Sequence, residues 1–151
     1  MNFPALNFPQ YSLSIRKNNF YYEIFDRIRK KWVKLTPEEW VRQHLIWYLI
    51  EDAYCPEGLI QVEFPFSYKN KNLRIDIAVF SNNFKPILLC ECKAPNLQIT
   101  HSVLTQAALY NITYKTPYIL LTNGLQHFCF FYENEWKLLK KIPVYSELLQ
   151  Y

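Results

Sequence analysis

The sequence predicts one mixed α/β (α+β) domain, residues 1–151, in which helices flank a central mixed β-sheet. Three observations predict this class. Apolar runs of strand length fill the middle of the chain, a well-capped helix start precedes them, and a second helical pattern follows them. A length of 151 residues suits a single domain. We expect its core over about residues 36–125 and an N-terminal β-hairpin over about 20–35.

The N-terminal third predicts a hairpin followed by a helix. Runs at 20–28 and 31–35 favour two strands separated by a polar break. Thr36 is a good N-cap residue and Glu39 follows it by three positions, which is the capping-box pattern. The helix is expected to continue to about Ala53, before a turn that contains proline and glycine.

The remainder of the chain predicts six more strands and a second helix. The strands are expected at 59–66, 72–80, 86–92, 117–122, 128–132 and 136–139. The run at 86–92 is almost continuously apolar, as in a central strand covered on both faces. Apolar residues near helical spacing predict a helix over 99–114, and a short helical turn is expected after Pro143.

The composition excludes several classes of function. Gly58 and Gly124, far apart in the sequence, are the only glycines. This excludes glycine-rich phosphate cradles, so we expect no nucleotide cofactor and no ATP-driven motor. No apolar run reaches the length of a membrane span and the N-terminus does not resemble a secretory signal, so no membrane partner is expected. Four cysteines without disulfide or zinc spacing favour free thiols and a cytoplasmic location.

The net charge of +4 is concentrated near the N-terminus. The basic side chains of the hairpin region are Arg27, Arg29, Lys30, Lys31 and Lys34. Two interpretations stay open for them. They form either a footprint for a phosphate backbone or simply a solvated hairpin face.

Charged residues interrupt two of the apolar strands. Asp76 lies within the run at 72–80, and Glu91 and Lys93 end the run at 86–92. Strand alternation puts Glu91 and Lys93 on one face and the two cysteines of that run on the other, in a core. If the two strands pair, Asp76 approaches Glu91, with Lys93 beside them.

Two adjacent carboxylates repel each other unless they share a cation or a proton. Mg²⁺ is an oxygen-preferring ion that would resolve the conflict between Asp76 and Glu91. The ammonium of Lys93 could then orient a metal-bound water or stabilise charge on a phosphate. The alternative is a pair of ordinary salt bridges, Asp76 with Lys93 or Arg74 with Glu91.

An ordered series of motifs resembles a known family. The stretch RIDIAVF at 74–80, followed by LLCECKAP at 88–95, is similar to the core of the PD-(D/E)XK nuclease superfamily. More narrowly it resembles the N-terminal nuclease domain of the R subunits of type I restriction enzymes. Further matches are TPEEWVRQHL at 36–45, TQAALYN at 105–111 and LLTNG at 120–124. The resemblance covers roughly residues 20–140.

The resemblance implies a restriction-endonuclease-like core and a role for each motif residue. Asp76 and Glu91 would be ligands of Mg²⁺ or Mn²⁺, and Lys93 would be the catalytic lysine. The implied activity is metal-dependent hydrolysis of DNA phosphodiester bonds. The implied partners are DNA and either a second copy of the chain or other subunits of a restriction system.

Three further residues take roles from the same resemblance. Gln106 and Tyr110 are four positions apart on the predicted second helix, hence on one face. In the family this pair lies beside the active site, whereas by spacing alone it could be ordinary surface polarity. Glu39 matches the helix carboxylate that reaches the metal directly or through water; a glutamate favoured by the helix dipole is the competing explanation.

Two other functions stay open at this point. The chain could be a non-catalytic nucleic-acid-binding or assembly module that retains the nuclease fold. It could also be a protein-interaction subunit in which the strand charges only form salt bridges. Only the nuclease requires a divalent ion for turnover, which separates it from the other two.

Overall fold

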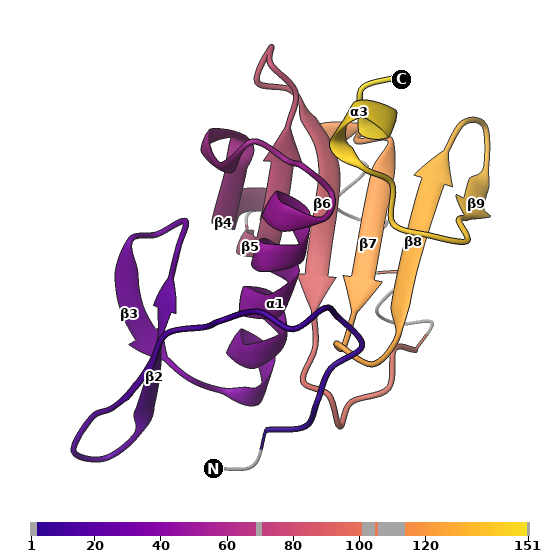
Figure 1. Ribbon diagram of the computed structural model, residues 1–151. Helices are drawn as coiled ribbons and strands as arrows, with labels where there is room; N and C mark the ends of the chain where they lie inside the picture. Colours follow the sequence, from indigo (N-terminus) through magenta and orange to yellow (C-terminus); the bar gives the residue numbers. More distant parts are fainter. Residues whose placement is uncertain (1–2, 69–70, 101–104, 106–113, 151) are drawn as a thin grey trace.

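The computed structural model describes residues 3–68, 71–100, 105 and 114–150. It confirms a mixed fold, in which helix α1 (Pro37–Glu51) lies against one face of a six-stranded sheet (Figure 1). The strands of this sheet are β4 (Ile60–Tyr68), β5 (Lys71–Phe80), β6 (Pro86–Cys92), β7 (Tyr118–Thr122), β8 (His127–Tyr132) and β9 (Trp136–Leu138). The short helices η1 (Glu57–Leu59) and α3 (Tyr145–Leu148) are further elements outside the N-terminal sheet.

The six strands follow one another in sequence order across the sheet. Strands β6 and β7 are parallel, and the other neighbours are antiparallel. The sheet is therefore mixed, as predicted. The helix predicted over 99–114 falls almost entirely outside the described residues, and so do Gln106 and Tyr110.

The N-terminal sheet has three strands, where the sequence predicted two. Strands β2 (Tyr22–Asp26) and β3 (Lys31–Lys34) form the expected hairpin, and β1 (Ile15–Lys17) pairs with the free edge of β2. All three residues of β1 are exposed. A strand so short and so exposed has no hydrophobic alternation, which is why the sequence did not predict it.

The predicted start of α1 is confirmed. The Thr36 side-chain oxygen accepts a hydrogen bond from the Glu39 backbone amide at 3.1 Å, as an N-cap should. The helix ends at Glu51, slightly before the predicted end at Ala53. Leu45 and Leu49 in its second half are fully buried in the main core, whereas its first half buries polar and charged side chains.

Strand β6 lies at the centre of the packing. From its second residue onward every side chain is buried, and Cys90 and Cys92 pack in the cluster that includes α1, as alternation predicted. The four cysteines are all free and buried, and burial raises the pKa of Cys55 and of Cys129 to about 12. In the described parts of the chain, no helix combines the length and apolar character needed to cross a membrane.

The N-terminal segment, residues 3–11, ties α1 to the loop between β7 and β8. Trp40 donates a hydrogen bond from its indole nitrogen to the Pro4 carbonyl at 3.2 Å, and the Asn7 amide donates to the Gly124 carbonyl at 2.7 Å. Gly124 has a φ of +82°, and a Cβ there would lie 2.8 Å from a Leu6 methyl group. The positive φ favours glycine at position 124, and an added Cβ would also have to displace the Leu6 side chain.

Candidate active site

The structure places Asp76 and Glu91 on adjacent strands. The antiparallel register of β5 and β6 pairs Ile77 with Cys90, so Asp76 and Glu91 are the next residues toward the carboxyl end of β6. Lys93 is the first residue after β6, and its backbone amide donates a hydrogen bond to the Thr122 carbonyl of β7 at 2.8 Å. The pairing of the central strands therefore fixes the backbone on which all three candidate side chains stand.

Lys93 and Glu91 form an ion pair at this end of the sheet. The distance from the Lys93 Nζ to the Glu91 Oε1 is 2.7 Å, and the two side chains are 23% and 7% exposed. Burial acts to lower the pKa of Lys93, but the hydrogen bond and charge of Glu91 outweigh it, so the pKa is raised above its ordinary value. Lys93 is therefore a cation at neutral pH.

Asp76 is held by donors from two different elements. Its Oδ2 accepts a hydrogen bond from the Cys92 backbone amide at 2.6 Å, and its Oδ1 accepts one from the Arg42 Nη2 at 2.6 Å. An ionised carboxylate offers about four lone-pair sites. Asp76 is thus fixed in orientation and still has capacity to accept further ligands.

Arg42 is a residue of this site that the sequence analysis missed. Its guanidinium also binds the Glu39 Oε2 at 2.5 Å and the Glu38 Oε1 at 3.1 Å, and its side chain is only 8% exposed. Burial would lower the pKa of Arg42, but the charges of Asp76 and Glu39 more than offset it, so its pKa is raised. Its spacing of three and four positions from the two glutamates could have indicated helix ion pairs. Nothing local indicated its bond to Asp76.

Glu39 uses both of its carboxylate oxygens on side chains of the protein. Its Oε2 binds Arg42, and its Oε1 accepts hydrogen bonds from the Arg29 Nη2 and the Gln43 Nε2, both at 2.9 Å. Arg29 in turn binds Asp26 at 2.7 Å. We call the resulting series of alternating charges, Asp26, Arg29, Glu39, Arg42 and Asp76, the ion-pair chain.

Three of the five basic side chains of the hairpin region pair with carboxylates of the protein. Arg27 and Lys30 bind carboxylates of α1 and η1 at 2.6–3.1 Å, and Arg29 is buried in the ion-pair chain. Lys31 and Lys34 stay exposed. Folding brings carboxylates from distant segments against the hairpin. The net charge counted over the hairpin sequence alone does not include them.

The salt bridges expected as the alternative also differ from those observed. Asp76 pairs with Arg42 and Lys93 pairs with Glu91. Arg74 is 71% exposed and faces a β4 carboxylate at 3.7 Å. Asp76, Glu91 and Lys93 are thus all charge-paired, but with partners other than the predicted ones.

The donor set where the carboxyl end of β6 lies beside the middle of β5 suits a hard divalent ion. Asp76 and Glu91 offer carboxylate oxygens, and Mg²⁺ in proteins is typically bound through one or two carboxylates with water or phosphate completing its shell. Burial raises the pKa of the neighbouring Cys92 thiol well above its usual value, so it does not offer a thiolate. Within the described residues, no three Asp, Glu, His or Cys side chains converge as a metal-binding group. Asp76 and Glu91 are therefore the pair of carboxylates considered for such an ion.

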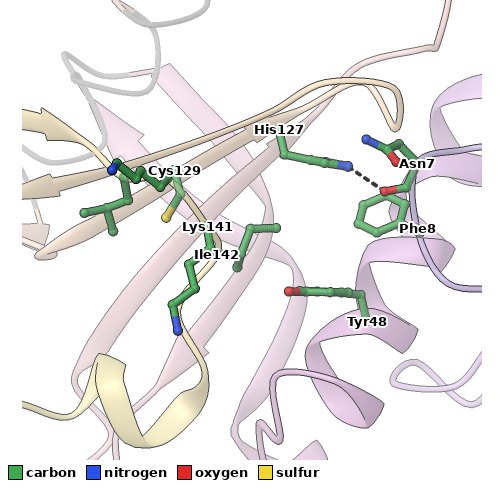
Figure 2. Close-up of a pocket in the computed structure, with 9 residues that line it drawn as sticks. Asn7, Phe8, Tyr48, His127, Cys129, Lys141 and Ile142 are labelled. Carbon is green, nitrogen blue, oxygen red and sulfur yellow. Dashed lines mark hydrogen bonds between the residues drawn. The ribbon is translucent and has the colours of Figure 1, made fainter.

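A separate cavity of about 280 Å³ lies elsewhere in the molecule. Figure 2 shows it between the N-terminal segment, α1, β8 and the segment before α3, with Phe8, Tyr48 and Cys129 among its lining residues. The His127 Nε2 donates to the Asn7 carbonyl at its rim, at 2.9 Å. Its lining residues do not include Asp76, Glu91, Lys93 or Glu39.

Solved structures that resemble the fold include the following two. One is a fragment of a candidate HsdR subunit of a type I restriction enzyme from Vibrio vulnificus YJ016, with a TM-score of 0.59 and 20% identity over 76% of this chain. This chain covers 24% of that protein's chain. The other is a candidate nuclease of the DUF820 group from Anabaena variabilis ATCC 29413, with a TM-score of 0.50 and 14% identity over 82% of each chain. At these identities the likeness concerns the fold alone.

The sequence family is shown by a different comparison. No curated protein matches this chain. The family model described as the type I restriction enzyme R protein N terminus matches residues 37–143, from the start of α1 to just before α3. This match includes Asp76, Glu91 and Lys93 and spans well over half of the sequence. The chain therefore belongs to the family of type I restriction enzyme R protein N-terminal domains.

Proposed function

We propose that this chain is a metal-dependent nuclease that hydrolyses DNA phosphodiester bonds. The observation that carries the proposal is the arrangement of Asp76, Glu91 and Lys93 where the carboxyl end of β6 pairs with the middle of β5. Membership of the R-protein family and the fold shared with a candidate nuclease support the same reaction class.

Asp76 and Glu91 are the residues that would hold Mg²⁺ or Mn²⁺. When bound, such an ion supplies a Lewis acid for a phosphate oxygen and lowers the pKa of coordinated water. Lys93 keeps a positive charge beside this position through its bond to Glu91. Its ammonium stabilises negative charge that develops on the phosphate during hydrolysis.

The exposed lysines of β3 are the proposed contacts for the DNA backbone. We expect the double variant Lys31→Ala/Lys34→Ala to weaken DNA binding and to reduce the slope of log K against log salt by about 2, since each phosphate contact contributes about 0.9. Fluorescence anisotropy over a salt series measures this slope. The control is Lys85→Ala/Lys140→Ala, which removes two exposed lysines from other regions. Equal slopes for the two double variants would exclude β3 from the DNA contact.

The test of the reaction itself is cleavage with and without a divalent ion. The purified chain is incubated with linear, circular and single-stranded DNA and with RNA, in Mg²⁺, Mn²⁺ or EDTA. We expect products only with a divalent ion, and a loss on the order of 100-fold or more in Asp76→Asn, because ion-dependent charge stabilisation contributes several kcal/mol. Asp52→Asn, at the C-terminal cap of α1, is the matched control. Cleavage that persists in EDTA, or no cleavage of any substrate, contradicts the proposal.

One observation favours the second candidate, a non-catalytic nucleic-acid-binding module. Asp76 and Glu91 each already bind a protein cation at hydrogen-bond distance. A purely structural set of ion pairs would have this appearance. Such a module would bind DNA with the same salt dependence and would show no turnover. Its Asp76→Asn variant would bind DNA as tightly as the wild type.

A further inference from the structure

We infer that Arg42 is a positioning residue that sets the orientation of Asp76, and that Glu39 affects the site only through Arg42. The inference rests on the proposed function, because Asp76 is a proposed metal ligand. It adds Arg42 to the residues of the site, and it states that Glu39 acts on Asp76 through Arg42. The ion-pair chain connects the N-terminal sheet to the position where the divalent ion would bind.

The first step is the geometry of Arg42. From α1 it spans to β5, with Nη2 2.6 Å from Asp76 and Nη1 2.5 Å from Glu39. A guanidinium is planar and presents its donors at fixed angles, so holding one carboxylate constrains where the other is held. With the Cys92 amide on the second oxygen of Asp76, this carboxylate is held from α1 and from β6 at the same time.

The second step is the position of Glu39. Three side-chain donors, from Arg29, Arg42 and Gln43, bind its two oxygens, and its side chain is 8% exposed. About three of its four lone-pair sites are therefore in use. This occupancy suits an anchor for two arginines better than a ligand of an ion. Glu39 holds Arg42, and Arg42 holds Asp76.

The third step is the origin of the chain in the N-terminal sheet. Asp26 in β2 is fully buried and binds both the Arg29 side chain and the Gln43 Nε2, each at 2.7 Å. Gln43 also binds Glu39, so it links two of the three carboxylates that hold Arg29; the third is Glu63 of β4, at 3.0 Å. Because separating buried charges from their partners costs free energy, these contacts hold the members of the chain in fixed relative positions. The ion-pair chain thus links β2 to Asp76 through continuous contacts.

The principal test is Arg42→Lys, which keeps the charge and loses the planar fork. We expect kcat to fall about 10–100-fold and the affinity for Mn²⁺, measured without DNA, to fall by a similar factor, which is typical when a residue that orients a metal ligand is changed. The KM for DNA is expected to stay within about twofold. Arg74→Lys, at a largely exposed arginine on β5 itself, is the matched control and is expected to leave all three quantities unchanged.

A second readout does not need the metal or the reaction. The Cys92 amide bonds to Asp76, so its NMR chemical shift reports where that carboxylate lies. We expect this amide resonance to move in Arg42→Lys and not in Arg74→Lys, with the remaining resonances showing an intact fold. If the wild-type chain binds no Mn²⁺, the proposed function fails, while this resonance still tests the positioning.

The role of Glu39 is tested by a double-mutant cycle. If Glu39 acts only through Arg42, Glu39→Gln reduces Mn²⁺ affinity in the wild type but adds almost nothing in the Arg42→Lys background. If Glu39 binds the ion itself, the reduction in Mn²⁺ affinity in the double variant is the product of the reductions caused by Glu39→Gln and by Arg42→Lys alone. Multiplying reductions overturn the inference, and so does an Arg42→Lys variant with wild-type Mn²⁺ affinity and an unmoved Cys92 amide.

Discussion

Lys93→Gln is expected to reduce DNA cleavage by about 10²–10³-fold, because it removes the cation proposed to stabilise the charge on the reacting phosphate. Glutamine can still donate a hydrogen bond to Glu91, which in the wild type binds the ammonium at 2.7 Å. The partly buried ion pair is thus replaced by a neutral bond, and the fold is expected to persist. Single-turnover cleavage over a Mg²⁺ series measures the effect.

The control for Lys93→Gln is Lys85→Gln, at an exposed position in the loop between β5 and β6. It makes the same chemical change outside the site and should cleave at the wild-type rate. In Ca²⁺, both variants should bind DNA with similar affinity. The lower cleavage by Lys93→Gln would then reflect slower turnover and not weaker binding. A Lys93→Gln variant that cleaves within about threefold of the wild type would remove Lys93 from the reaction.

Arg42→Met is expected to destabilise the fold by about 3–5 kcal/mol, which is typical of removing one partner from a buried charge pair. The change leaves Asp76 and Glu39 facing each other without the guanidinium that separates them, in side chains that are 14% and 8% exposed. Urea denaturation followed by circular dichroism measures the free energy of unfolding. A shifted midpoint with an unchanged slope identifies a loss of stability.

Two further variants show whether this loss arises from uncompensated charge. Arg74→Met removes an exposed arginine and is expected to change stability by less than about 0.5 kcal/mol. Arg42→Met/Asp76→Asn removes the cation together with one of the carboxylates, and should recover part of the lost stability. If the double variant is no more stable than Arg42→Met, then packing around the arginine stem, rather than charge, accounts for the loss.

Several features of the fold could be predicted because they depend on neighbours in the sequence. The capping of α1 by Thr36 involves an amide three residues away. The buried run at 86–92 coincides with β6, since a continuous apolar stretch of this length suits a central strand. The order of the motifs around Asp76 and Glu91 indicated the family that the comparison with the family model shows.

The partners of the charged residues could not be predicted in this way. Arg42 and Asp76 are 34 positions apart, and Arg27 binds Glu57 from 30 positions away. The position of a cation in the sequence does not indicate which carboxylate it will pair with. It can form an ion pair with any carboxylate that the fold brings close to it. For this reason the sequence did not indicate that Arg27, Arg29 and Lys30 pair with carboxylates, and Arg42 was overlooked for the same reason.

The sequence by itself therefore determined the mixed sheet, the start of α1, and the strands that carry Asp76, Glu91 and Lys93. These follow from hydrophobic periodicity and local capping, which act over a few residues. Only the tertiary structure decided that Asp76 is held by Arg42 and that Glu39 is enclosed by arginines. Those contacts exist because α1 packs across the sheet and the N-terminal strands lie against α1. Their buried charges must then pair with whatever opposite charge lies near.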